Sequence, residues 1–293
     1  FNYLIMGTIG ATFYVIGVGF LYAATGTLNM ADMAARLATL GDSSMVQAGF
    51  AFVVVGLGLK AAMFPLHGWL PGAYSYAPSL IAIFLASTAT KTSIYLMARF
   101  VFDIFPDGAA FGQGFIAWIL APLAAAAAIV CSLQALFEKE IRRILAFSSG
   151  AQVGFILLGL SLASVGGASA GLFYIGAHAL MKMTLFMALG GVALSLGSRR
   201  LDDFAGVARE APWSATAFAV GAASLAGVPL TLGFLAKWRL IEAALQAGAF
   251  WSVGVGGGAP GGAPPFGGPG AGGAFFPAAP GRGGRAAGGP PRG

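Results

Sequence analysis

Two lysines and one histidine lie deep inside long apolar stretches of the sequence, where a charged side chain is costly. Lys91 lies in FLASTATKTSIYLMARF, and Lys182 lies in FYIGAHALMKMTLFMALGG, four residues after His178. Two more lysines, Lys60 and Lys237, lie near the ends of such stretches. A charge at the centre of a bilayer costs about 2.5–3.5 kcal/mol, and such residues usually mark ion pathways. Their positions therefore predict chemistry inside a membrane.

The chemistry that these side chains offer is proton transfer. A low dielectric disfavours the charged form of a lysine, so a buried lysine can take up and release a proton near neutral pH. His178 and Lys182 are four residues apart and share one face of a helix. Ionisable groups linked by hydroxyls and water form proton relays in membrane proteins. Hydroxyl-bearing residues around Lys91 extend the row: Ser87, Thr88, Thr90, Thr92 and Ser93.

Each of these residues also has a structural interpretation. Lys60 and Lys237 are close enough to helix ends for their ammonium groups to reach the lipid headgroups. Lys91 and Lys182 would instead donate a hydrogen bond to a backbone carbonyl. His178 would be a core residue that fills space.

The composition of the chain is that of a polytopic membrane protein. Hydrophobic residues make up 58% of the 293 residues and charged residues only 9%, and the mean hydropathy is +0.83. Soluble domains carry about 25% charged residues, which argues against a soluble enzyme, a disordered chain or a nucleic-acid-binding protein. The single cysteine, Cys131, excludes a disulfide framework and a cysteine-based metal cluster within the chain. We expect no metal and no cofactor on this chain.

Seven apolar runs are long enough to cross about 30 Å of hydrocarbon, which predicts an all-α fold of about seven transmembrane helices. The loops over 65–78, 137–142 and 198–211 carry most of the loop arginines and lysines, which predicts that they are cytoplasmic. The segment 28–40 has helical spacing and is expected to lie at the outer interface. The runs are 3–24, 45–64, 79–101, 112–136, 143–163, 168–197 and 212–235, followed by a shorter helix over 237–250.

Proline and glycine interrupt two of the runs close to a lysine. Pro65 follows Lys60, and three such residues precede Lys237. They free backbone carbonyls, which is tolerated at membrane depth only where the carbonyls face protein or water. Broken helices at matching places in two halves are typical of inverted-repeat transporters, and a packing kink is the alternative. The three residues before Lys237 are Gly227, Pro229 and Gly233.

The two ends of the sequence differ from its middle. The chain starts inside an apolar run, with no Met and no basic segment before it, so we expect its upstream helices to be missing. The stretch 253–293 is rich in Gly and Pro, the poorest helix formers. We therefore expect a transmembrane domain over 1–252 and a low-complexity tail over 253–293 that is disordered or a reading-frame artefact.

Five segments, in order along the chain, resemble the antiporter-like membrane subunit family. This family includes subunits of NADH:quinone oxidoreductase (complex I), of membrane-bound hydrogenases and of Mrp-type multisubunit sodium/proton antiporters. The loop PLHGWLPGAYSYAPS and the ending GFLAKWRLIEAAL are most similar to the D subunit of the Mrp-type antiporters. The five segments are KAAMFPLHGWLPGAYSYAPS, ATKTSIYLMARF, EKEIRRILAFSSGAQVGFILLGL, AHALMKMTLFMALGG and LAGVPLTLGFLAKW.

The resemblance implies an inverted-repeat antiporter-like fold, of which this chain holds the later half. It also implies a hydrated polar row at mid-membrane. The glutamate that pairs with position 60 in the family would lie on an earlier helix, before Phe1. The residues that match the row are Lys60, Lys91, His178, Lys182 and Lys237.

The function that the resemblance implies is ion translocation in a multisubunit cation/proton antiporter. The alternatives are a proton-pumping subunit of NADH:quinone oxidoreductase or of a related hydrogenase, and a structural or quinone-binding scaffold. The expected partners are other membrane subunits and the lipid bilayer. The expected transported ions are protons, with sodium ions as an open alternative. We expect a multi-pass protein of the bacterial inner membrane. The sequence has no Rossmann fingerprint, haem-ligand pair or iron–sulfur cysteine set. Any redox reaction would therefore take place on other chains, and whether the complex is an enzyme stays open.

Overall fold

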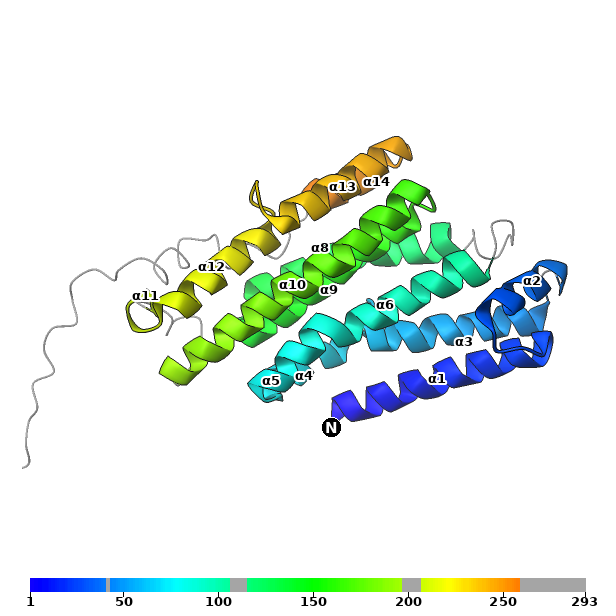
Figure 1. Cartoon of the computed structure of the whole chain (residues 1–293), viewed down its shortest axis with the longest axis horizontal. Helices are drawn as coiled ribbons and strands as arrows, with labels where there is room; N and C mark the ends of the chain where they lie inside the picture. The colour runs from blue at the N-terminus through cyan, green and yellow to red at the C-terminus, as the bar shows by residue number, and fades with distance from the viewer. Residues whose placement is uncertain (41–42, 106–114, 197–206, 259–293) are drawn as a thin grey trace, which may run out of the picture.

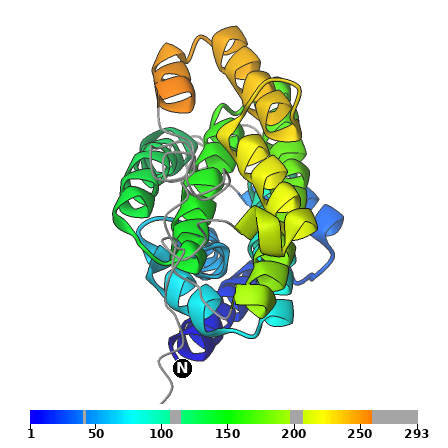
Figure 2. The same ribbon diagram turned by 90° about the vertical axis from the view of Figure 1, so that its left-hand side faces the viewer.

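The computed structural model describes residues 1–40, 43–105, 115–196 and 207–258, and these residues form a bundle of helices without strands. The helices run along the long axis of the bundle (Figure 1). Helix α1 (Asn2–Thr25) lies at one edge, and α12 (Pro212–Ala226), α13 (Leu232–Gln246) and α14 (Phe250–Gly258) lie toward the opposite edge (Figure 1, Figure 2).

Among the described residues, six helical stretches are long and apolar enough to cross a membrane. The expected all-α, multi-pass architecture is therefore confirmed. The stretches are Asn2–Thr25, Ser44–Tyr76, Ser79–Ile104, Trp118–Phe137, Ile141–Ser161 and Val165–Ala193.

Several of these stretches contain a break or a π-helical segment. The second consists of α3 (Ser44–Ala61), a 3-10 turn (Leu66–Trp69) and α4 (Leu70–Tyr76). The third consists of α5 (Ser79–Phe84), a π-helical segment (Leu85–Ala89), α6 (Thr90–Arg99) and another π-helical segment (Phe100–Ile104). A π-helical segment (Ile116–Leu120) also precedes α8 (Ala121–Phe137), and α9 (Ile141–Ser161) and α10 (Val165–Leu196) follow.

The connections between crossings alternate between the two ends of the bundle. Helix α2 (Met30–Leu40) and the α9–α10 turn lie at one end, and the α4–α5 and α8–α9 turns lie at the other (Figure 1). Helix α2 buries Met33 and Leu37 and exposes an Asp32–Arg36 ion pair of 3.0 Å, as its spacing predicts. The chain therefore crosses back and forth as the apolar runs indicate.

The seventh expected run, 212–235, is divided at the break that Gly227 and Pro229 predict, and its bounds differ from the expected ones. Helix α12 ends at Ala226 and α13 begins at Leu232, and each has 15 residues. A helix of that length spans about 22 Å, less than the hydrocarbon thickness. The two helices follow each other along the bundle (Figure 1), and the second of them, α13, ends at Gln246.

Some expectations fall partly or wholly on residues outside the described ranges. These include Arg199 and Arg200 of the basic loop over 198–211, and most of the tail. Helix α14 extends to Gly258, so the first residues of the Gly- and Pro-rich stretch are helical, and residues 259–293 are not described.

Glycines allow α1 and α3 to approach until their backbones touch. A Cβ atom on Gly56 would lie 2.5 Å from the backbone nitrogen of Tyr14 and 2.7 Å from the carbonyl oxygen of Gly10. A Cβ on Gly17 would lie 2.6 Å from the backbone nitrogen of Val53. Small residues at helix interfaces are a usual means of close packing in membranes, and here they fix α1 against the helix that carries Lys60.

We expect Gly56→Ala to separate α1 from α3 and to lower the stability of the protein by about 1–3 kcal/mol, the usual cost of overpacking. The measurement is thermal unfolding of the purified protein in detergent. Gly19→Ala is the matched control, because a Cβ on Gly19 meets nothing within 4 Å. Equal unfolding temperatures for the two variants would contradict the close contact.

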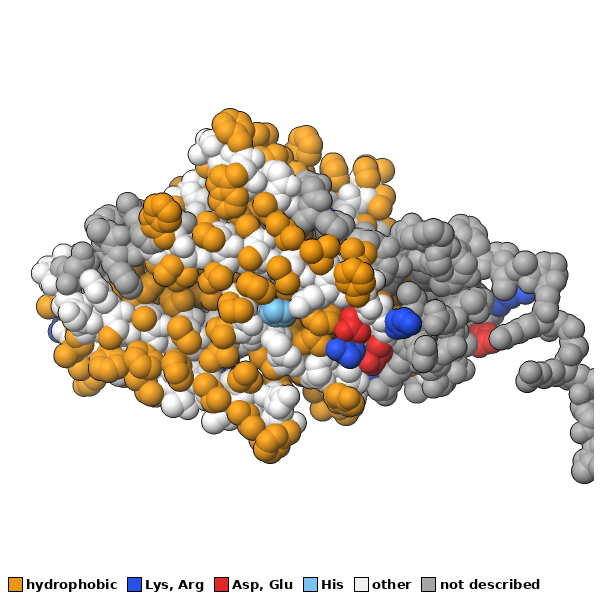
Figure 3. Space-filling view, turned by 180° about the vertical axis from the view of Figure 1, so that it is seen from behind, with side chains coloured by type: hydrophobic (Ala, Val, Ile, Leu, Met, Phe, Trp, Pro, Cys, Tyr) orange, Lys and Arg blue, Asp and Glu red, His pale blue; other side chains and the backbone are white. Residues whose placement is uncertain are grey.

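Large apolar side chains cover most of the outer surface. Trp118 and Phe84 are exposed, as are many aliphatic side chains. Figure 3 shows hydrophobic side chains over most of one face, with charged side chains gathered toward one end. Such a surface suits lipid as the solvent.

Candidate functional site

The helices that carry the candidate residues pack against one another in sequence across the bundle. Helix α3 carries Lys60 and packs against α6, which carries Lys91. Helix α10 carries His178 and Lys182 and packs against α6 and the π-helical segment before it. It also packs against α13, which carries Lys237. The five residues, called the row below, thus lie on four helices that pack in the order α3, α6, α10 and α13.

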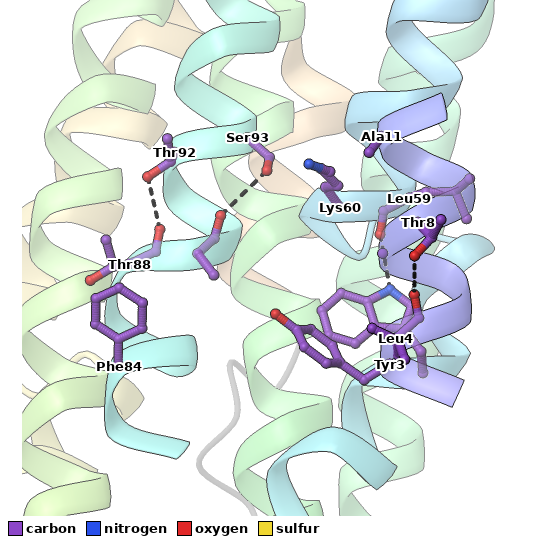
Figure 4. Close-up of a pocket in the computed structure, with 13 residues that line it drawn as sticks. Tyr3, Leu4, Thr8, Ala11, Leu59, Lys60, Phe84, Thr88, Thr92 and Ser93 are labelled. Atoms are coloured by element: carbon purple, nitrogen blue, oxygen red, sulfur yellow. Dashed lines mark hydrogen bonds between the residues drawn. The ribbon is translucent and has the colours of Figure 1, made fainter. Parts of the chain in front are cut away.

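Lys60 lines an open cavity of about 620 Å³ between α1, α3 and the α5–α6 stretch. Figure 4 shows its side chain pointing from α3 toward the helix that carries Thr88, Thr92 and Ser93. The Thr92 and Ser93 hydroxyls donate to the carbonyls of Thr88 and Ala89, at 3.2 and 3.3 Å. The oxygens of these hydroxyls stay available to water or to an ammonium group. Of the five residues in the row, Lys60 is the one that is exposed.

Lys91 is buried, 4% exposed, and is the second residue of α6, which follows a π-helical segment. Its ammonium group donates to the carbonyl of Ala86, inside that segment, and to the Thr90 hydroxyl at 3.2 Å. A π turn shifts the backbone hydrogen-bond register and is frequent at functional sites. Here it provides a carbonyl for a charged group inside a membrane-spanning stretch.

Lys182 is fully buried and donates to the Leu145 carbonyl at 2.7 Å and to the Ser148 hydroxyl at 2.5 Å. His178, one helical turn away, is also fully buried, and neither ring nitrogen finds a hydrogen-bond partner within the described residues. Helix α6, which carries Lys91, packs against α10, which carries His178 and Lys182.

Lys237 uses a carbonyl that the second helix break frees. Its ammonium group donates to the Ala226 carbonyl at 2.7 Å and lies 5.8 Å from the centre of the Phe155 ring. The break follows from local sequence: Gly227 ends α12 with φ 89°, and Thr231 caps α13 by accepting from the Phe234 amide at 3.4 Å. One of the expected break residues, Gly227, lies beside the ammonium group, since a Cβ on Gly227 would lie 3.3 Å from the Lys237 nitrogen.

Gly233 and Pro229 complete this break. The Gly233 amide donates to the Ser224 hydroxyl at 3.1 Å, and a Cβ on Gly233 would lie 1.8 Å from the Ser224 carbonyl oxygen. Only glycine fits at so close an approach. Pro229 lies in the connecting turn between α12 and α13.

The first break lies directly after Lys60. Helix α3 ends in the left-handed residue Ala62 (φ 55°), and Pro65 precedes the 3-10 turn. The Trp69 indole donates to the freed Leu59 carbonyl at 2.9 Å. The two breaks therefore use similar chemistry, a side-chain donor on a freed carbonyl.

Arg142 is a structural residue that the sequence did not single out. It was expected in a basic loop, yet it is only 2% exposed. Its guanidinium group donates to the Ala77 carbonyl at 2.7 Å, the Ser79 hydroxyl at 2.9 Å and the Ser75 carbonyl at 3.4 Å. It thereby holds the end of the first broken helix against α9. The apolar pattern of α9 indicates which side of the helix faces the bundle, and this would have distinguished Arg142 from its exposed neighbour Arg143.

We expect Arg142→Lys to lower stability by about 1–3 kcal/mol, because a lysine cannot reproduce the planar donor geometry and leaves buried acceptors unpaired. Arg143→Lys is the control. Arg143 forms an ion pair of 3.0 Å with Glu138 and its side chain is 46% exposed, and such pairs contribute about 0–1 kcal/mol. Thermal unfolding in detergent measures both, and an equal or larger loss for Arg143→Lys would contradict this role.

The described residues hold no cluster of three or more His, Cys, Asp or Glu side chains. Their three ion pairs are Asp32–Arg36, Arg99–Asp103 and Glu138–Arg143, none of which includes a residue of the row. Within these ranges, the buried lysines are thus held by carbonyls and hydroxyls rather than by carboxylates. This also agrees with the structural alternative for Lys91 and Lys182, so hydrogen-bond geometry alone does not separate the two interpretations.

Broken membrane-spanning helices around buried lysines define a class of protein, the polytopic antiporter-like membrane subunits. The chain belongs to the family described as NADH:quinone oxidoreductase/Mrp antiporter transmembrane proteins, which matches residues 1–259.

Three comparisons place the chain within this family. The N subunit of the NADH-quinone oxidoreductase of Desulforudis audaxviator is 45% identical over 254 residues, which are 87% of this chain and 50% of that protein. The D subunit of the Na(+)/H(+) antiporter of Bacillus subtilis is 30% identical over 249 residues, 85% and 50% of the two chains. The membrane-bound sulfane sulfur reductase, an archaeal respiratory membrane complex, has a chain with TM-score 0.82 and 36% identity, covering 88% of this chain and 52% of that one. The chain spans about half the length of these relatives.

Proposed function

We propose that the chain is an ion-translocating membrane subunit that relays protons through the row formed by Lys60, Lys91, His178, Lys182 and Lys237. The observation that carries this proposal is the packing of α3, α6, α10 and α13 in that order, with Lys91, His178 and Lys182 buried and Lys60 at an open cavity. If the row were only structural, a histidine would gain nothing over an apolar residue at position 178, because its ring nitrogens lack hydrogen-bond partners in the described residues.

The chemistry assigns a different role to each group. Lys60, in the open cavity, exchanges protons with water and with the adjacent hydroxyls. Lys91 and Lys182 hold protons as ammonium groups on carbonyls and hydroxyls, and His178 passes a proton between them through its two nitrogens. Lys237, at the second break, is the end of the row within this chain.

Two kinds of parent complex remain candidates. The identity of 45% to an oxidoreductase N subunit, against 30% to an antiporter D subunit, favours a proton-pumping subunit of NADH:quinone oxidoreductase. An Mrp-type cation/proton antiporter, the first expectation from the sequence motifs, is the second candidate. In either case the partners would be other membrane subunits, and sodium ions would be a substrate only in the second.

We further propose that the protein lies in the bacterial inner membrane with the α8–α9 turn in the cytoplasm. That turn carries Lys139 and is followed at the start of α9 by Arg143, and basic loop residues favour the cytoplasmic side.

The test is proton movement by the complete complex in liposomes, followed with an internal pH dye. NADH with a quinone drives one assay, and an imposed sodium gradient drives the other. We expect a pH change in at least one assay, and the assay that responds identifies the parent complex. Proton movement in neither assay, from a fully assembled complex, would contradict the proposed function.

A further inference from the structure

A buried tyrosine extends the α10 face that carries His178 and Lys182. Tyr174 lies four residues before His178, so Tyr174, His178 and Lys182 follow one another along one face, one turn apart. Tyr174 is 1% exposed, and its hydroxyl donates to the Gln152 side-chain oxygen of α9 at 2.5 Å. Gln152 is fully buried and lies one turn from Ser148, the residue that accepts from Lys182. The polar contacts between α9 and α10 therefore continue beyond Lys182.

This extension leads toward Lys237. The Tyr174 ring stacks on the Phe155 ring, with 6.3 Å between ring centres and 29° between planes. Another neighbour of Phe155 is the Lys237 ammonium group, 5.8 Å from the centre of the same ring. Helices α9, α10 and α13 all pack against one another. Tyr174 is thus one helical turn from His178 on α10 and shares a neighbour, the Phe155 ring, with Lys237.

We propose that Tyr174 is a further proton-relay residue, which transfers protons between His178 and Lys237, and that Gln152 is the positioning residue that holds its hydroxyl. The proposal rests on the proposed proton relay and adds a residue to it. A phenol hydroxyl has one donor hydrogen and two lone pairs, so it can accept a proton on one side and release one on the other.

The transfer leaves the phenol unchanged. The His178 imidazolium gives its proton to the Tyr174 oxygen, while the hydroxyl turns from Gln152 and its own proton leaves toward Lys237. One O–H bond forms and one breaks, the imidazole becomes neutral, and the lysine amine becomes an ammonium group. No electron is transferred. When the hydroxyl returns to Gln152, the donor hydrogen points away from Lys237 and the step is reset.

A structural role for Tyr174 makes a different prediction, because the ring rather than the hydroxyl contacts Phe155. The decisive variants therefore keep the ring. Tyr174→Phe removes only the hydroxyl, and fluorotyrosine incorporated at position 174 keeps the hydroxyl but makes it more acidic. Tyr22→Phe is the matched control, since Tyr22 is 50% exposed and lies on α1, which carries no residue of the row.

The experiment measures proton movement by the complete complex in liposomes, with the amount of assembled protein determined in parallel. We expect Tyr174→Phe to reduce the rate about a hundredfold, the lower end of the range for loss of a proton-transfer group, with normal assembly. We also expect fluorotyrosine at position 174 to change the rate without changing assembly. Tyr22→Phe should match the unmodified complex.

Unchanged rates for both Tyr174 variants would overturn the inference while leaving the proposed relay intact. A rate that falls only in proportion to the amount of assembled complex would also overturn it, in favour of packing. If the unmodified complex moves no protons, the proposed function fails instead, so the two failures are distinguishable.

Discussion

Lys182→Met is expected to abolish proton movement while leaving the complex assembled. Methionine has nearly the volume of lysine and suits the buried, apolar surroundings of α10. It removes the group that is both fully buried and hydrogen-bonded to α9. We expect a loss of about a hundredfold or more in the rate, the scale of losing a positioned proton-transfer group.

The hydrogen bonds around Lys182 explain why assembly should survive this change. The Leu145 carbonyl also accepts from the Ser148 hydroxyl at 3.0 Å and from the Ser149 hydroxyl at 2.9 Å. It therefore keeps partners when the ammonium group is gone. The Ser148 hydroxyl loses the ammonium donor but keeps its own hydrogen bond to the Leu145 carbonyl. Removing a buried charge also removes its desolvation cost.

The measurement is the rate of proton movement in liposomes, normalised to assembled complex. Lys139→Met is the matched control, because Lys139 is exposed in the α8–α9 turn and the substitution removes the same charge outside the membrane. Full proton movement by Lys182→Met would refute the relay and favour the structural interpretation, in which the lysine only ties α10 to α9.

Much of the fold was predictable, because a membrane crossing depends on the length and composition of one apolar run and not on contacts between distant residues. Long runs without charges determine membrane crossings, and Gly227 with Pro229 mark the second break from their backbone preferences alone. The candidate lysines were recognisable for a similar reason, since a cation within an apolar run is conspicuous. Their roles stay predictions, because a hydrogen bond to a carbonyl suits both a relay and a structural anchor.

The contacts across helices were not predictable, because they depend on helix rotation and on close approach in space. Arg142 and Arg143 are adjacent in sequence, yet one is buried and the other exposed, according to their phase on α9. The Tyr174–Gln152 bond joins residues on different helices. The spacing of four residues between Tyr174 and His178 did indicate a shared helix face. A tyrosine within an apolar run is common, however, so this spacing alone did not mark Tyr174 as a site residue. The bounds of the run over 212–235 were misjudged because α13 begins after the break and ends at Gln246.

His178 should be dispensable for stability and necessary for transport, which separates function from packing more sharply than any other variant. Both of its ring nitrogens are buried without a partner in the described residues. An unsatisfied buried polar group costs about 1–3 kcal/mol, and replacing it with an apolar group of similar shape is neutral or stabilising. We therefore expect His178→Leu to unfold at the same temperature as the unmodified protein or at a higher one.

The same substitution should slow proton movement about tenfold or more, because leucine can neither accept nor donate a proton and the Lys91–Lys182 transfer loses its intermediate. Thermal unfolding in detergent and proton movement in liposomes are measured on the same preparations. Met181→Leu, a buried apolar exchange on the same turn, is the control and should change both quantities little. If His178→Leu instead lowers the unfolding temperature and the rate together, His178 is a packing residue. A stable protein with slow transport would mean that the histidine is kept, at a cost in stability, for the protons it passes.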